Sequence, residues 1–109
     1  MSGKTLQRDI RFDDAGFAIV PYEKPPVAVR WTDVREVFAM KRDLFAIDEI
    51  CLGFTLDEAG GYVRTGEDDG GFLAFRTEVE RRFKIDPTWF GRIVQPPFAE
   101  NRTTLWRRP

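Results

Sequence analysis

Histidine is absent from this sequence of 109 residues, and Cys51 is its only cysteine. The lack of histidine excludes the commonest general base, the histidine-activated serine and cysteine nucleophiles, and the usual ligands of zinc. A single cysteine excludes a disulfide within the chain, and the apolar neighbours Ile50 and Leu52 predict a buried, unreactive thiol. We therefore expect no catalytic constellation, no metal site and no cofactor.

Long apolar runs and an excess of one charge are missing as well. No run approaches the roughly 18 apolar residues that a transmembrane helix needs, and the first residues do not resemble a signal peptide. The 17 basic residues balance 18 acidic ones, whereas nucleic-acid-binding domains usually carry a basic excess. We expect a soluble cytoplasmic protein that binds no nucleic acid and is no integral membrane protein. Its oligomeric state stays open.

The residues that are present suffice for one folded domain with its own core. Hydrophobic residues make up 42% of the chain and phenylalanine occurs ten times, which is too much apolar surface for a disordered segment. A chain of this length usually forms a single domain and buries roughly two thirds of the surface that the unfolded chain exposes. We expect residues 1–109 to form a single α+β domain.

Alternating apolar and polar residues predict several strands in the first part of the chain. Residues 6–22 have the pattern of a β-hairpin with Gly16 in its turn, and a third strand is predicted over 27–31. Prolines follow the hairpin, and proline lacks the donor that a strand ladder requires, so this segment should be an edge or a loop.

The next segment, 34–41, fits both a helix and a strand. Its β-branched and aromatic residues favour a strand, with a bulge near Asp33 and a turn at 41–43. The clearest strand pattern in the chain covers 50–56 and has small residues on one face. After a glycine-rich turn, 62–65 form its short partner.

An amphipathic helix is predicted over 71–84, where large apolar residues recur at i, i+3, i+7 and i+11. These residues are Phe72, Phe75, Val79 and Phe83. We expect Asp68 or Asp69 to cap this helix. Acid-before-base pairs at i, i+4 should support it. They are Glu78 with Arg82 and Glu80 with Lys84.

Two shorter elements complete the predicted fold. Asp86 has the character of an N-cap for a short second helix over 87–93, and 103–106 have strand propensity. The fold class is therefore α+β: a curved antiparallel sheet, or a partly open barrel, of about six or seven strands packed on one amphipathic helix. The phenylalanines of that helix should dock onto the inner side of the sheet.

One motif resembles a known family. The segment Val29-Arg30-Trp31-Thr32-Asp33-Val34-Arg35-Glu36-Val37 is similar to a tryptophan-centred strand of bacterial pleckstrin-homology-like domains. The order of elements, strands over 6–65 and then the helix at 71–84, also resembles that family over about 80 residues. The chain departs from the family by continuing beyond the helix. The resemblance implies a scaffold that binds a lipid headgroup or a peptide.

Charged and aromatic residues supply the candidate binding site. Carboxylates lie next to the most strongly predicted strand, and basic residues occupy a predicted turn. An arginine beside an aromatic ring can bind a phosphate or a stacked base. The candidates are Lys41, Arg42, Asp48, Glu49, Arg64, Trp106 and Arg107. Ordinary roles compete with this interpretation: an exposed strand end for Asp48 and Glu49, a solvated terminus for Arg102, Arg107 and Arg108, and core positions with backbone partners for the tryptophans. The acidic loop 67–69 is better explained by a turn and a helix cap than by a bound cation.

Three functional hypotheses follow. The first is a non-enzymatic binding or protein-interaction domain, such as an adaptor or an immunity-type protein, because catalytic residues are lacking and three tryptophans suit an interface. The second is a small-molecule binder or enzyme that uses carboxylates and arginines. It requires a deep pocket lined by at least two of Arg42, Asp48, Glu49 and Arg64. The third is attachment to a membrane surface, which requires a basic face or an amphipathic anchor.

Overall fold

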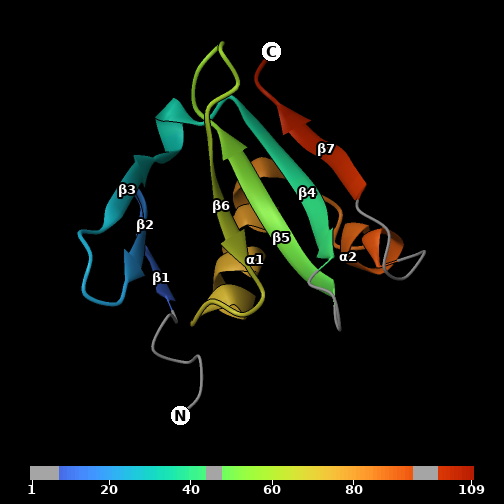
Figure 1. Cartoon of the computed structure of the whole chain (residues 1–109). Helices are drawn as coiled ribbons and strands as arrows, with labels where there is room; N and C mark the ends of the chain where they lie inside the picture. Colours follow the sequence, from blue (N-terminus) through green and yellow to red (C-terminus); the bar gives the residue numbers. More distant parts are fainter. Residues whose placement is uncertain (1–7, 44–47, 95–100) are drawn as a thin grey trace.

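Seven strands and two α-helices make up the part of the chain that the computed structural model describes, namely residues 8–43, 48–94 and 101–109. Sheet A has the order β1-β2-β3 and sheet B the order β6-β5-β4-β7, and all pairings within them are antiparallel. The two sheets do not close into a barrel (Figure 1). The strands are β1 (Arg8–Phe12), β2 (Gly16–Pro21), β3 (Val27–Arg30), β4 (Glu36–Asp43), β5 (Asp48–Thr55), β6 (Tyr62–Gly66) and β7 (Asn101–Arg107). The helices are α1 (Phe72–Phe83) and α2 (Trp89–Ile93).

Sheet A confirms the predicted hairpin and third strand. The Asp13 carboxylate accepts hydrogen bonds from the backbone N–H groups of Ala15 and Gly16, which fixes the hairpin turn. Gly16 lies so close to β3 that an added Cβ would be 2.0 Å from the Val29 carbonyl oxygen. On its other edge β1 exchanges two backbone hydrogen bonds with the segment around Gly70. Sheet A is thereby joined to the loop that leads into α1.

Sheet B confirms that the ambiguous segment is a strand, but two details were predicted wrongly. Lys41, Arg42 and Asp43 do not form a turn, because β4 continues through them and pairs with β5 as far as Asp43 opposite Asp48. The expected bulge near Asp33 is also absent. Trp31–Asp33 form one turn of 3₁₀-helix, and the register shift lies further on, where β4 meets β7 between Val37 and Phe38.

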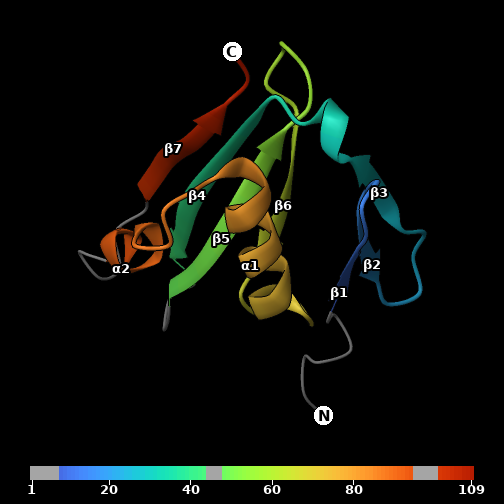
Figure 2. The ribbon, with the colours of Figure 1, turned by 180° about the vertical axis from the view of Figure 1, so that it is seen from behind.

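Helix α1 lies on one face of sheet B, in front of that sheet in Figure 2, with sheet A beside it. Three residues of its predicted apolar stripe, Phe72, Phe75 and Val79, are buried. Phe83, the fourth, is half-buried against the core, with its ring 4.6 Å from that of Trp106. The central prediction, that this stripe docks onto the inner side of the sheet, is confirmed.

An aromatic cluster joins the two sheets through this helix. The Phe17 ring from β2 lies 4.8 Å from Phe54 of β5 and 5.0 Å from Phe75 of α1. Trp31 stacks on Phe75 at 6.2 Å, and its indole N–H donates to the Asp13 carbonyl. Aromatic pairs in such tilted and offset arrangements stabilise a core beyond the area they bury.

The ends of α1 differ from the prediction. Its N-cap is Gly71, whose φ of 81° lies in the left-handed region that favours glycine, and no side chain caps the helix. Asp69 instead receives the Arg8 guanidinium at 2.7 Å and the Gly66 backbone N–H at 2.8 Å. The expected cap by Asp68 or Asp69 is therefore wrong: Asp69 ties sheet A to the loop after β6.

One of the two expected side-chain pairs on α1 is present. Arg82 contacts Glu78 at 2.8 Å as predicted. Glu80 contacts Arg76 at 2.7 Å and accepts the Trp89 indole N–H at 2.8 Å, in place of the predicted pair with Lys84. The Trp89 indole thus binds a side chain and not the expected backbone partner.

Helix α2 starts two positions later than predicted, at Trp89, and the Asp86 carboxylate accepts the Thr88 backbone N–H before it. The expected last strand is β7, which pairs with β4. Neither helix in the described ranges has the length and apolar character required to cross a bilayer.

Candidate functional site

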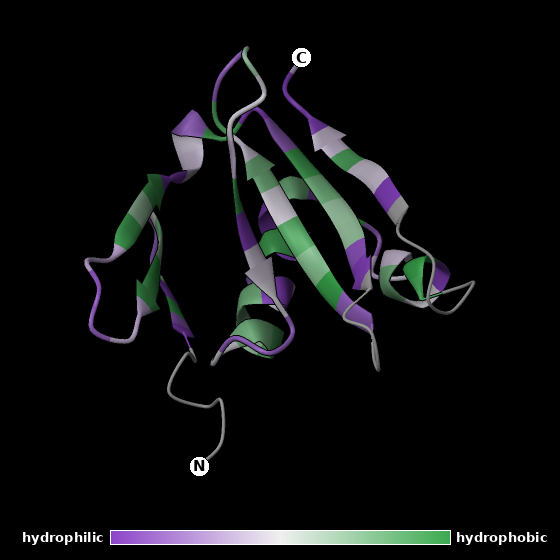
Figure 3. Ribbon diagram, viewed as in Figure 1, coloured by the Kyte–Doolittle hydropathy of each residue, from purple (hydrophilic) through white to green (hydrophobic). Residues whose placement is uncertain are grey.

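Charged residues gather where β4 ends and β5 begins, at the lower end of sheet B in Figure 3. Successive side chains of a strand point to opposite faces of the sheet, so the sequence candidates in this cluster are divided between two faces. Lys41 and Asp48 lie on the inner face, toward the helices. Arg42 and Glu49 are register partners on the other face, which we call the outer face of sheet B.

The inner pair, Lys41 and Asp48, belongs to the folded interior. Lys41 is 1% exposed, and its Nζ donates to the carbonyl of Val94, the residue that follows α2, at 3.1 Å. The Asp48 carboxylate lies 3.9 Å from the same ammonium. Both expectations for these residues, a hairpin tip for Lys41 and an exposed strand end for Asp48, are wrong. These two residues attach the end of α2 to the sheet.

Outward-facing residues alternate with core-facing residues on β4, β5 and β6, and on β7 except at its register shift. No element of the described chain covers this outer face (Figure 1). Its register is fixed by the antiparallel pairing of the four strands. Its residues are Glu36, Phe38, Met40, Arg42, Glu49, Cys51, Gly53, Thr55, Tyr62, Arg64, Arg102, Thr104 and Arg107.

At one end of this face, two arginines share one carboxylate. Arg42 donates to Glu49 at 3.1 Å, and Arg64 lies 3.6 Å from the same oxygen. Glu49 is only 6% exposed, so the expected exposed strand end is wrong here too. Gly66 makes the space for it, because an added Cβ would lie 2.1 Å from the Glu49 carboxylate.

Cys51 lies beside this cluster with its sulfur 3.9 Å from the Arg64 guanidinium, which donates to it. The thiol is fully buried, and burial, together with the nearby Glu49 charge, raises the pKa of Cys51 to about 11. A thiol is nucleophilic as its thiolate, so this cysteine has little reactive form near neutral pH.

At the other end of the face, Glu36 repeats the arrangement. Thr104 donates a hydrogen bond to its carboxylate, Arg107 donates at 3.4 Å, and Arg102 lies 3.8 Å away. The hydrogen bond from Thr104 is the largest cause that lowers the pKa of Glu36, and the two arginines add to it. Glu36 is therefore a fixed anion between two cations at neutral pH.

Between the two clusters lies Phe38, whose side chain is fully buried although it faces outward. Arg102 covers one part of the ring, with its guanidinium carbon 3.7 Å from the ring centre, and Tyr62 covers another at 5.3 Å. Beneath it is Gly53, where an added Cβ would lie 2.1 Å from the ring. The small residues noted in the sequence thus accommodate a phenylalanine of the same sheet, and not a separate element.

Trp106 and Arg107, the last two sequence candidates, do not act together. Trp106 lies opposite Val37 on the inner face and contacts Phe83, whereas Arg107 lies opposite Glu36 on the outer face. The cation nearest the Trp106 ring is Arg108, at 5.7 Å from the ring centre. Trp106 and Arg107 therefore do not form the pair of an arginine beside an aromatic ring that could bind a phosphate, which leaves the competing role of Trp106 as a tryptophan packed against the core.

Several residues of the outer face were not among the sequence candidates, notably Glu36, Phe38, Tyr62 and Arg102. The alternation of side chains in β4 places Phe38 and Met40 on one face, but nothing in a single strand says which face the helices cover. The packing of α1 and α2 decides it, and pairing with β7, distant in the sequence, brings Arg102 onto the opposite face beside Phe38.

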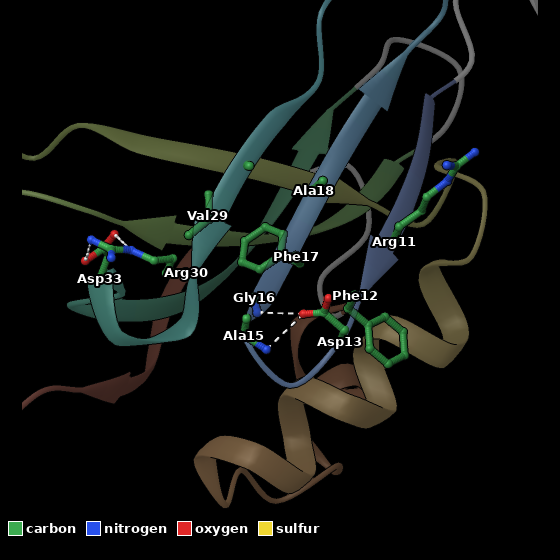
Figure 4. Close-up of a pocket in the computed structure, with 11 residues that line it drawn as sticks. Arg11, Phe12, Asp13, Ala15, Gly16, Phe17, Ala18, Val29, Arg30 and Asp33 are labelled. Atoms are coloured by element: carbon green, nitrogen blue, oxygen red, sulfur yellow. Dashed lines mark hydrogen bonds and ion pairs between the residues drawn. The ribbon is translucent and has the colours of Figure 1, made fainter.

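The structure also contains pockets on other surfaces. One of about 410 Å³ lies along sheet A, between the hairpin turn and the end of β3 (Figure 4). Its polar groups are already engaged, because Asp13 holds its own turn and Arg30 pairs with Asp33 at 3.1 Å. Arg11 points away from that pair in the same view. Arg42, Asp48, Glu49 and Arg64 line neither this pocket nor three others that are lined entirely by described residues.

The acidic loop after β6 has structural partners. Glu67 accepts the Ile50 backbone N–H at 2.9 Å, and Asp69 holds Arg8. Among the described residues, no three acidic or sulfur side chains come together in a way that could hold a metal ion.

Comparison with known proteins gives no match, whether with family models, with curated proteins or with solved structures.

Proposed function

We propose that this chain is a non-catalytic protein-interaction domain, and that the outer face of sheet B is its binding surface. One observation carries the proposal. A sheet face that no described element covers presents arginines and a tyrosine on a rigid base, and these residue types dominate the binding energy of protein interfaces.

Rigidity of the base supports this use of the face. Phe38, Cys51 and Gly53 are held beneath the exposed side chains, and each arginine pair is oriented by a carboxylate that is itself buried or nearly so. Side chains that are already ordered lose less conformational entropy when a partner binds. Tyr62, 47% exposed at the edge of the Phe38 ring, offers an aromatic anchor on this base.

The shape of the face favours a macromolecule over a small substrate. Its charged groups are spread along the strands, and none of the four described pockets includes Arg42, Glu49 or Arg64. Asp48, the fourth residue that the enzyme hypothesis named, faces the interior instead. A binding scaffold is also what the resemblance to pleckstrin-homology-like domains implies.

Site-specific photo-crosslinking tests the proposal. A photoreactive amino acid is placed at Tyr62 and, as a matched control, at Tyr22, which is 61% exposed and lies beyond β2, away from this face. We expect a crosslinked protein from Tyr62 and none from Tyr22. The captured protein, once purified, should bind the chain in a defined stoichiometry, and Tyr62→Ala should weaken binding while Tyr22→Ala does not. Equal capture at both positions, or none at Tyr62, would contradict the proposal.

A further inference from the structure

The outer face of sheet B carries an excess of positive charge that the whole chain does not have. Four arginines and two glutamates lie on it, against a net charge of −1 for the sequence. Each glutamate is shared by two arginines, so each cluster keeps one uncompensated positive charge.

The guanidinium groups also keep donors that the described residues do not use. Among the described residues, the Arg42 guanidinium makes a single hydrogen bond, to Glu49, and the Arg107 guanidinium makes a single long one, to Glu36. Arg102 donates none within the described part of the chain, and its side chain is 53% exposed. Since a guanidinium has five N–H donors in a planar fork that matches a carboxylate, these groups can still donate hydrogen bonds to an anionic ligand.

The arginine side chains form two pairs, one at each end of the outer face. One pair meets at Glu49 and the other at Glu36. The strand register places these two glutamates six positions apart, or roughly 20 Å along the strands. In an extended peptide the side chains on one face recur every second residue, so a segment of about seven residues spans this distance.

From this arrangement we infer that the outer face of sheet B binds an extended acidic segment of another protein, whose carboxylates meet both arginine pairs. The inference rests on the proposed interaction function and names the partner's chemistry. A single small anion would reach only one pair, because the glutamates that hold the two pairs lie roughly 20 Å apart. An acidic segment laid along the strands reaches both pairs, with Tyr62 and the half-buried Met40 beside the chain.

Synthetic peptides test the inference on the intact chain. The probe is a peptide of about eight residues in which glutamate and serine alternate, so that its acidic side chains share one face when extended. Glutamine–serine and lysine–serine peptides of the same length are its controls. Binding is followed by fluorescence anisotropy and by amide chemical shifts of the unaltered protein. We expect only the glutamate peptide to bind, to shift amides of β4 to β7, and to weaken steeply with added salt.

Two proteins that each carry two arginine substitutions test where the glutamate peptide binds. Arg42→Gln with Arg102→Gln should weaken binding of the glutamate peptide by about tenfold or more, since both lose charge-assisted contacts. Arg11→Gln with Arg30→Gln, which removes the same charge from exposed positions of sheet A, should change it by less than about twofold. Circular dichroism of each variant shows that it is folded, and the chemical-shift map of the unaltered chain needs no variant.

Other outcomes overturn the inference. Equal binding of the glutamine peptide, shifts confined to sheet A, or tighter binding to vesicles of phosphatidylserine and phosphatidylcholine than to the peptide would each reject an acidic protein segment as the ligand. If Tyr62 still crosslinks a purified partner that lacks an acidic segment, this inference fails and the interaction function stands. If Tyr62 captures no protein, the interaction function itself fails.

Discussion

The two faces of β4 and β5 each bury a phenylalanine completely, but by different means. On the inner face, Phe54 is enclosed by Phe17 and by Phe75 of α1. On the outer face, Phe38 is enclosed by Arg102 and Tyr62, whose own outer surfaces remain in contact with solvent. Complete burial therefore does not distinguish a core from a binding surface. What covers the buried group does, because a cover of side chains leaves polar groups in contact with solvent, where a partner can reach them, whereas a cover of helix does not.

Truncating the two phenylalanines should give the largest difference in stability between the two faces. We expect Phe54→Ala to cost about 3 to 5 kcal/mol in the free energy of unfolding, and Phe75→Ala a similar amount, because each leaves a cavity that the surrounding core cannot fill. Phe38→Ala should cost about 2 kcal/mol, since Arg102 and Tyr62 can settle into the space. Urea denaturation gives all three values. Equal costs for Phe38 and Phe54 would show that both faces are equally rigid.

Adjacent charges on β4 provide the second contrast. Lys41→Met should cost about 2 to 3 kcal/mol, because it removes the ammonium that neutralises Asp48 and holds the end of α2. Arg42→Met should cost less than about 1 kcal/mol, since Arg42 is partly exposed and Glu49 keeps Arg64. The comparison uses denaturation at one pH and salt concentration. A larger loss for Arg42 would mean that the outer face contributes more to stability than the attachment of α2.

Gly53 allows a test of how firmly the outer aromatic layer is held. Gly53→Ala should destabilise the protein by about 2 kcal/mol, because the new Cβ would lie 2.1 Å from the Phe38 ring. In the Phe38→Ala background the same change should cost little, so that a double-mutant cycle gives a clear coupling energy. Gly91→Ala in α2 is the matched control, since nothing lies within 4 Å of its added Cβ. It should be neutral or slightly stabilising. Absence of coupling would place Phe38 away from Gly53.

Local patterns were enough to predict much of the fold. The spacing of Phe72, Phe75 and Val79 located α1, and the alternation after Glu49 located β5. These signals depend on one face being apolar, which each segment carries by itself. The ends of the strands were harder to predict. Lys41 to Asp43 have the composition of a turn, and only their pairing with β5 extends β4 through them.

The candidate site could be predicted only in part, for a related reason. Arg42, Glu49 and Arg64 were among the candidates, and the structure brings them together. Their association with Glu36 and Arg102 depends on β7 pairing with β4 across more than half of the chain, and a single sequence contains no signal for that register. Because successive side chains of a strand point to opposite faces, Lys41 and Arg42 lie on different faces although they are neighbours in the sequence.

The ionisation of Cys51 is the smallest expected effect, and it tests whether the outer layer opens. In the unfolded chain the thiol ionises near its ordinary pKa of 9.0, whereas burial raises its pKa to about 11 in the folded protein. The contribution of this thiol to the free energy of unfolding is therefore fully present below pH 9 and is lost as the pH rises toward 11. The reason is that the unfolded state releases the thiol proton at a lower pH than the folded state does. Relative to Cys51→Ala, the stability of the unaltered protein should fall by about 1 kcal/mol between pH 8 and pH 10. The contrary outcome is that stability varies with pH in parallel for the two proteins and that a thiol reagent labels native Cys51 rapidly. Together these results would mean that the cover formed by Arg64 opens readily. The outer face would then not be the rigid base on which the binding proposal relies.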